Sequence, residues 1–125
     1  MEDGGLATAR DVREAAEAAR AEGRLGIDTE FMSEGRYRPL LCLVQVAVGG
    51  NGDQPPDILL IDTLADEALL RPIAQALADP QIEVVVHAGR QDIAILRRVC
   101  AIEVRNVFDT QVAGGFAGSS AQTGR

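Results

Sequence analysis

Residues 25–31 read LGIDTEF, and the apolar side chains on either side of the acids predict a buried strand that carries two carboxylates. Asp28 and Glu30 are two positions apart, so both side chains project from the same face of that strand. Two carboxylates held side by side disfavour each other's ionisation. A divalent cation such as Mg²⁺ or Mn²⁺, which prefers oxygen ligands, would offset this repulsion most directly. The stretch therefore predicts a metal site built on one strand of a sheet.

The pattern around this stretch predicts an α/β fold with a mixed sheet flanked by helices. Helical patterns cover residues 8–22, 66–77 and 90–99, and strand patterns cover residues 25–31, 40–48, 57–62, 82–86 and 104–108. Short connections between the first three strands indicate an antiparallel meander, whereas the later alternation of strand and helix indicates βαβ units with right-handed crossovers. These elements place the domain within residues 1–113, and the glycine-rich residues 114–125 are expected to form a disordered tail.

Composition fits one domain that works in a reducing compartment. The 125 residues carry a formal net charge of −7, which argues against a surface built mainly to track phosphates. A carboxylate-rich cleft that holds cations for phosphate chemistry is compatible with that charge. No apolar run approaches the roughly 20 residues needed to span a bilayer, so we expect a cytoplasmic protein without a membrane partner. Cys42 and Cys100 have no metal-binding spacing and are expected to be buried thiols.

A third acid follows the strand predicted at residues 82–86. Residues 87–92 read HAGRQD, and they lie where this strand gives way to the next helix. Ligands of α/β sheets gather at such strand ends. Asp92 falls in the first turn of the helix, where the helix dipole favours an anion. If the strand at 82–86 lies beside the strand at 25–31, Asp92 approaches Asp28 and Glu30.

Five segments in order resemble ribonuclease D. They are IDTEF at 27–31, YRPLLCLVQV at 37–46, IDTL at 61–64, HAGRQDI at 87–93 and VFDTQ at 107–111. Ribonuclease D belongs to the DEDD superfamily of 3′-5′ exonucleases, whose catalytic domain has a ribonuclease H-like fold. The resemblance extends from about residue 8 to residue 111. It implies a mixed five-stranded ribonuclease H-like sheet and an enzyme that shortens RNA from its 3′ end, such as structured RNA or tRNA precursors.

The resemblance also implies roles for the acids. Asp28 and Glu30 match the acidic pair of the first exonuclease motif, and Asp92 matches the aspartate of the second. By that resemblance Asp28 bridges two Mg²⁺ or Mn²⁺ ions, Glu30 binds the first ion and Asp92 serves the second. The implied chemistry is two-metal hydrolysis of the terminal phosphodiester. Substrate-binding positions near the nucleotide cleft are, by the same resemblance, Phe31, Gln45 and His87.

The third motif of the family, Tyr-x-x-x-Asp, is missing from these residues. Tyr37 is the single tyrosine, and it lies before the second motif rather than after the third strand–helix unit. We therefore expect an incomplete two-ion site, an exonuclease domain truncated at its C-terminal end, and a chain that is inactive by itself. Apolar sheet surface left uncovered would then favour a homodimer or a domain swap.

Several of these residues also have ordinary structural interpretations. The pair Asp28 and Glu30 could be exposed acids at a strand end, and Asp92 could be a solvated first-turn acid. His87 is better interpreted as a residue that satisfies backbone groups or orients a loop than as a general base. Asp109 suits an N-cap of a short helix at 110–113.

Three further residues have other interpretations. Asp62 ends a strand and is expected to cap or form a turn. Arg36 and Arg38 flank Tyr37 in the loop after the first strand, where they could contact phosphates or stacked bases.

Two other functions compete with the exonuclease. One is a non-catalytic module that binds nucleic acid or self-associates. The other is a phosphoacceptor domain with a flavodoxin-like sheet, which would explain Asp28. That fold needs a parallel sheet, and the short connection at 49–57 argues against it.

Overall fold

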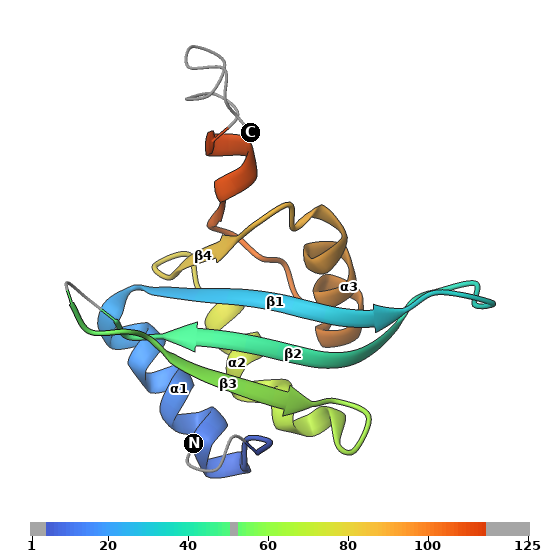
Figure 1. Ribbon diagram of the computed structural model, residues 1–125, viewed down its shortest axis with the longest axis horizontal. Coiled ribbons are helices and arrows are strands. Elements are labelled where there is room, and N and C mark those ends of the chain that lie inside the picture. The colour runs from blue at the N-terminus through green and yellow to red at the C-terminus, as the bar shows by residue number, and fades with distance from the viewer. Residues whose placement is uncertain (1–4, 51–52, 115–125) are drawn as a thin grey trace.

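The computed structural model describes residues 5–50 and 53–114, which form a mixed sheet with helices packed on it (Figure 1). The strand order is β3-β2-β1-β4-β5. In chain order the elements are α1 (Ala9–Glu22), β1 (Arg24–Met32), β2 (Leu40–Val48), β3 (Asp57–Asp62), the 3₁₀ helix η1 (Glu67–Leu70), α2 (Arg71–Leu77), β4 (Glu83–Val86), α3 (Arg90–Cys100) and β5 (Val107–Asp109). The predicted five-stranded mixed sheet is confirmed.

Strand directions follow from the lengths of the connections. β1, β2 and β3 form an antiparallel meander, whereas β4 pairs in parallel with β1, and β5 in parallel with β4. The chain moves across the sheet in the same direction from β3 to β4 and from β4 to β5. Right-handed crossovers therefore place α2 and α3 on the same face. α1 contacts α2 and packs on that face as well (Figure 1).

Helix α1 has strong signals at both ends. Thr8 accepts a hydrogen bond from the Asp11 amide, and the Asp11 carboxylate accepts one from the Thr8 amide, which is a capping box. Gly23 ends the helix in the left-handed conformation, with φ of 75°. The buried side of the helix consists largely of alanine, so the helix can lie close to the sheet.

The core lies between the sheet and its three α-helices. Along β1 the buried side chains of Leu25, Ile27 and Thr29 alternate with Gly26, Asp28 and Glu30 on the other face. Buried Ile61 of β3 and Val84 of β4 extend the same layer, and Leu96 of α3 is completely buried against it. The opposite face of the sheet retains exposed apolar side chains at Ile58 and Phe108. Its use in self-association stays a prediction.

Two predicted elements differ from the structure. The helix expected at 66–77 begins as the 3₁₀ helix η1 and becomes α-helical only at Arg71. Pro72 explains this change, because it has no N–H with which to continue an α-helix through the first turn. The strand expected at 104–108 is the shorter β5, since β4 offers it partners only from Val84 onward.

Several smaller expectations can also be compared with the structure. Residues 110–114 are helical, as expected, but the predicted tail lies outside the described residues from 115 onward. Cys42 and Cys100 are free but only partly buried, so the expectation of two buried thiols is wrong. In the described part of the chain, no helix is long and apolar enough to cross a membrane.

Leu96→Ala should lower the free energy of unfolding by about 2–5 kcal/mol, because it leaves a cavity between α3 and the sheet. Leu64→Ala is the matched control, since the same methyl groups are removed from a side chain that is 59% exposed. It should change stability by no more than about 0.5 kcal/mol. Urea denaturation followed by circular dichroism measures both variants. Equal losses would contradict the described packing of α3.

Candidate active site

The candidate site exists because β1 is longer than its parallel partner. The ladder between β1 and β4 covers only Arg24–Glu83, Leu25–Val84 and Gly26–Val85. β1 then continues through Asp28 and Glu30 to Met32, while the chain leaves β4 at Val86 and turns into α3. The first turn of α3 therefore lies beside the uncovered edge of β1. This arrangement brings residues from the first and second predicted motifs together.

Asp92 connects α3 to β1 directly. The hydroxyl of Thr29 donates a hydrogen bond of 2.7 Å to Oδ1 of Asp92, and both side chains are buried. Burial raises the pKa of Asp92 above its ordinary value; the Thr29 hydrogen bond opposes this, and the carboxylate of Asp28 raises the pKa further. The structure thus places Asp92 next to Asp28, as the sequence predicted.

No cation in the described residues balances these acids. The ion pairs there join Arg10 to Glu14, Arg24 to Glu83 and Arg97 to Glu103, and they leave out all three predicted ligands. Asp28 and Asp92 are adjacent oxygen donors, which is the chemistry that hard divalent cations prefer. Their position fits part of a metal site. Within residues 5–50 and 53–114, however, no group of three or more His, Cys, Asp or Glu side chains is arranged to hold an ion.

The three predicted ligands Asp28, Glu30 and Asp92 therefore do not form one group in the described residues. Glu30 is exposed on the same face of β1 as Asp28. A bulge follows it, because the register with β2 shifts between Glu30 and Phe31. The metal role of Asp28, Glu30 and Asp92 together stays a prediction.

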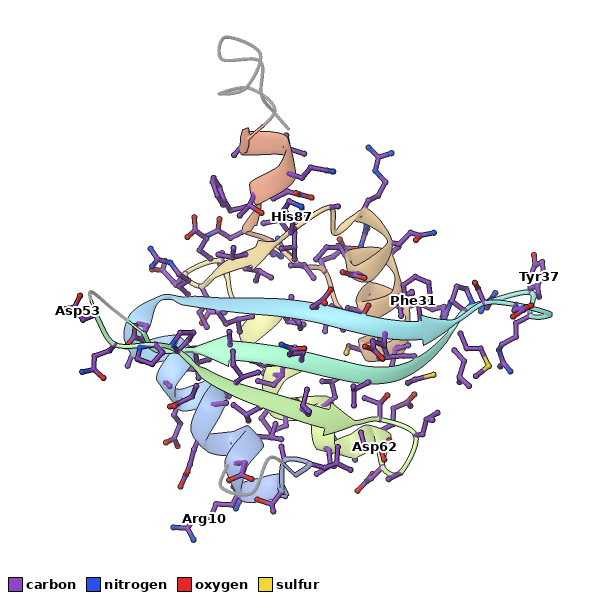
Figure 2. The ribbon with its side chains drawn as sticks, viewed as in Figure 1. Arg10, Phe31, Tyr37, Asp53, Asp62 and His87 are labelled. Atoms are coloured by element: carbon purple, nitrogen blue, oxygen red, sulfur yellow. The ribbon has the colours of Figure 1, made fainter. Side chains whose placement is uncertain are left out.

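Two of the predicted substrate-binding residues share a depression with Asp28. Gln45 lies directly opposite Asp28 in the β1–β2 ladder, and His87 follows the end of β4. Both line one pocket with Asp28, together with small residues of the sheet such as Gly26 and Ala47. Phe31 does not line this pocket; it packs partly against the core near the end of β1 (Figure 2).

His87 also has a structural contact. Its Nδ1 lies 2.7 Å from Oγ1 of Thr110, and that hydroxyl can donate to the carbonyl of Val86 at 3.3 Å. With Thr110 donating to Val86, Nδ1 carries the proton and donates to Thr110, so Nε2 is left as an acceptor. The imidazole can therefore orient the loop after β4 and still accept a hydrogen bond.

Sequence reasoning missed most of the contribution of Asp109. It caps the helical turn at 110–114 as expected, by accepting from the amides of Gln111 and Val112. It also accepts from the amides of Ala88 and Gly89, twenty or more residues earlier in the chain. The only sequence signal for this second contact is that the strand predicted before Asp109 should pair with the strand that precedes Ala88.

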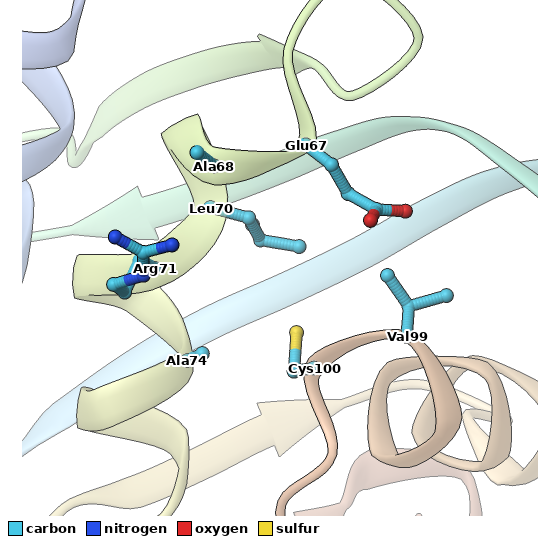
Figure 3. Close-up of a pocket in the computed structure, with 7 residues that line it drawn as sticks. All are labelled: Glu67, Ala68, Leu70, Arg71, Ala74, Val99 and Cys100. Atoms are coloured by element: carbon cyan, nitrogen blue, oxygen red, sulfur yellow. The ribbon is translucent and has the colours of Figure 1, made fainter.

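A second pocket lies away from these acids, between η1, α2 and the end of α3 (Figure 3). Glu67, Arg71 and Cys100 line it. Burial raises the pKa of the Cys100 thiol to about 11, and the charge of Glu67 contributes to this. A thiol with that pKa is protonated near neutral pH and is a poor nucleophile. We assign no chemistry to this pocket.

Comparison with known proteins supports the first site. The family described as "3′-5′ exonuclease" matches residues 6–124 of the chain. Ribonuclease D of Granulibacter bethesdensis is 45% identical over 84% of this chain and 25% of its own length. Ribonuclease D of Gluconacetobacter diazotrophicus is 38% identical over 95% of this chain and 29% of its own length. The chain therefore spans between a quarter and a third of these curated relatives.

A solved structure agrees with this relationship. RNase D of Escherichia coli, described as an exoribonuclease involved in structured RNA processing, superposes with a TM-score of 0.72 at 30% identity. The match covers 95% of this chain and 30% of that one. The resemblance to ribonuclease D and the ribonuclease H-like fold are confirmed.

Asp92→Asn should make the metal-free protein more stable near neutral pH, because the raised pKa shows that the fold disfavours the charged form. Protons bind the folded state more tightly, so wild-type stability falls as pH rises from the unfolded value of 3.8 through the folded pKa. The advantage of the variant should disappear below that window. Thermal denaturation in EDTA between pH 3 and 8 measures this. A variant that is less stable across the range would contradict the described environment of Asp92.

Proposed function

Because this chain belongs to the 3′-5′ exonuclease family, we propose that it supplies the first two motifs of a metal-dependent exoribonuclease of the ribonuclease D type. The observation that carries the proposal is the adjacency of Asp28 and Asp92, two carboxylates from separate motifs with no balancing cation among the described residues. Such a pair is costly in a fold that has no use for it. The substrate is the 3′ end of an RNA strand.

The metal requirement follows from the donors. Asp28 and Asp92 would hold Mg²⁺ or Mn²⁺, and Glu30 would join them from the same strand face as Asp28. A bound divalent ion supplies Lewis-acid polarisation of a phosphoryl oxygen and lowers the pKa of bound water. The hydroxyl of Thr29 holds Asp92 in place through its hydrogen bond, so this carboxylate is oriented before any ion arrives.

The depression beside Asp28 would receive the terminal nucleotide. Gln45 offers both a donor and an acceptor there, and His87 offers Nε2 as an acceptor. Small residues at the floor leave room for a ring to approach the sheet. Phe31, which packs on the core instead, would act on the substrate only through the shape of the end of β1.

The residues of this chain do not include the family's third motif. Tyr37 is the single tyrosine and is 96% exposed at the tip of the β1–β2 hairpin (Figure 2). Hydrolysis by these residues alone would lack the group that positions the attacking water. We therefore propose that the 125-residue chain holds the site without turning over substrate.

A chimera tests the proposed activity. Replacing the matching quarter of Granulibacter ribonuclease D with this chain should give an enzyme that shortens 5′-labelled RNA stepwise with Mn²⁺, whereas the isolated chain should not. Asp28→Asn or Asp92→Asn in the chimera should lower kcat by on the order of 10²–10³. Asp62→Asn is the control, because the Asp62 carboxylate accepts from the local amides of Leu64 and Ala65. A folded chimera that leaves RNA intact would contradict the proposal.

The hairpin tip is the proposed contact for RNA further from the 3′ end. Arg36 and Arg38 flank exposed Tyr37, and the guanidinium of Arg38 lies 6.0 Å from the ring centroid. The acidic site repels phosphates, so exposed arginines beyond the end of β1 offer a place where phosphates are attracted instead. Tyr37 can stack with a base.

Arg36→Ala with Arg38→Ala should reduce the salt dependence of RNA binding in EDTA. The slope of log K against log salt should fall in magnitude by about 0.7 for each lost phosphate contact to a single strand. Arg10→Ala with Arg13→Ala is the charge-matched control on α1, on the far side of the molecule (Figure 2). Fluorescence anisotropy at several salt concentrations gives both slopes. Equal changes in the two pairs would show a general charge effect and no contact at the tip.

A further inference from the structure

Asp109 collects backbone N–H groups from two segments that are far apart in the chain. Its Oδ1 accepts from Ala88 at 2.9 Å and from Gln111 at 2.9 Å, with Val112 at 3.4 Å, and its Oδ2 accepts from Gly89 at 3.0 Å. These hydrogen bonds hold the pKa of Asp109 below its ordinary value. The group is therefore a carboxylate near neutral pH, and it ties the loop after β4 to the end of β5.

The backbone of that loop adopts a conformation that its own residues do not favour. Ala88 has φ of 54°, a left-handed conformation that a residue with a Cβ adopts only at a cost. At Gly89 a Cβ would lie 2.6 Å from Cβ of Val86, so the position tolerates no side chain without a shift. Local preference alone would not select this path. Asp109 stabilises it, because the amides of Ala88 and Gly89 both donate to this one carboxylate.

The loop also determines where α3 begins. Gly89 is the N-cap, and it has no side chain that could cap the helix. Its carbonyl accepts the hydrogen bond from Ile93 that closes the first turn. Asp92 is the third residue of this turn, so its direction toward Thr29 depends on the position of Gly89.

We propose that Asp109 is a positioning residue for the candidate active site: by fixing Ala88 and Gly89 it sets the start of α3 and thereby aims Asp92 at Thr29 and Asp28. The relevance to catalysis rests on the proposed metal role of Asp92. The effect of Asp109 on the start of α3 and on the direction of Asp92 does not depend on that role. Thr110 reinforces the same junction through Val86 and His87.

Asp109→Asn is the informative variant. Its amide oxygen can still accept from Ala88 and Gln111, but its NH₂ group would face the Gly89 amide, so one defined contact is lost. Asp62→Asn is the matched control, because Asp62 also ends a strand and accepts from two local amides, those of Leu64 and Ala65. Within the described residues, the hydrogen bonds to the Asp62 carboxylate come from Leu64 and Ala65, and none comes from the loop after β4.

The experiment compares both variants with the wild-type chain by two-dimensional ¹⁵N NMR, amide exchange and Mn²⁺ titration. In Asp109→Asn we expect faster exchange at Gly89, shifted signals at Asp92 and Thr29, and a Mn²⁺ affinity lower by about tenfold or more. In Asp62→Asn we expect changes near Leu64 only. A purely structural role of Asp109 would lower stability without moving Asp92.

Two outcomes would overturn the inference. One is a folded Asp109→Asn variant whose Asp92 and Thr29 signals match the wild type. The other is a pair of variants that shift these signals equally. A wild-type chain that binds no Mn²⁺ would count against the proposed function instead, and the NMR comparison would still decide the role of Asp109. Asp109→Ala removes every contact at once, and failure of that variant to fold leaves Asp109→Asn as the deciding variant.

Discussion

The hydrogen bond from Thr29 to Asp92 joins the two halves of the molecule at the candidate active site. Thr29 belongs to the antiparallel meander, and Asp92 belongs to the βαβ unit that follows. The bond can form only because β1 extends past β4 and exposes its edge to the start of α3. It also brings a buried carboxylate next to Asp28, where the protein alone offers little compensation. Maintaining this contact therefore lowers the stability of the fold, because it keeps a buried carboxylate close to a second one.

Much of the architecture could be predicted from hydrophobic periodicity. The strands at 25–31, 40–48 and 57–62 have strong patterns and clear turns between them, and the structure contains each one. Boundaries were less predictable where another segment decides them. β5 is short because β4 gives it few partners, and α2 starts late because Pro72 interrupts the α-helical hydrogen bonds.

The candidate site was predictable only in part. The proximity of Asp92 to Asp28 followed from the order of strands, once β4 was placed beside β1. The bulge after Glu30 results from one extra residue on β2 and leaves no local pattern in the sequence, so the shape of the strand end beside these acids was not predictable. The hydrogen bonds from the amides of Ala88 and Gly89 to Asp109 join residues twenty or more positions apart, so they depend on tertiary structure that local propensities do not encode.

The floor of the depression beside Asp28 is made by Gly26 and Ala47, which are paired across β1 and β2. A Cβ added at Gly26 would meet Cβ of Ala47 at 3.6 Å and the Val85 carbonyl at 3.9 Å, both ordinary contact distances. The backbone therefore tolerates a methyl group there without rearrangement. A Gly26→Ala substitution would consequently add one methyl group to the lining of this depression. Residue 26 is therefore a position at which this depression can be made smaller while the strand that carries Asp28 stays in place.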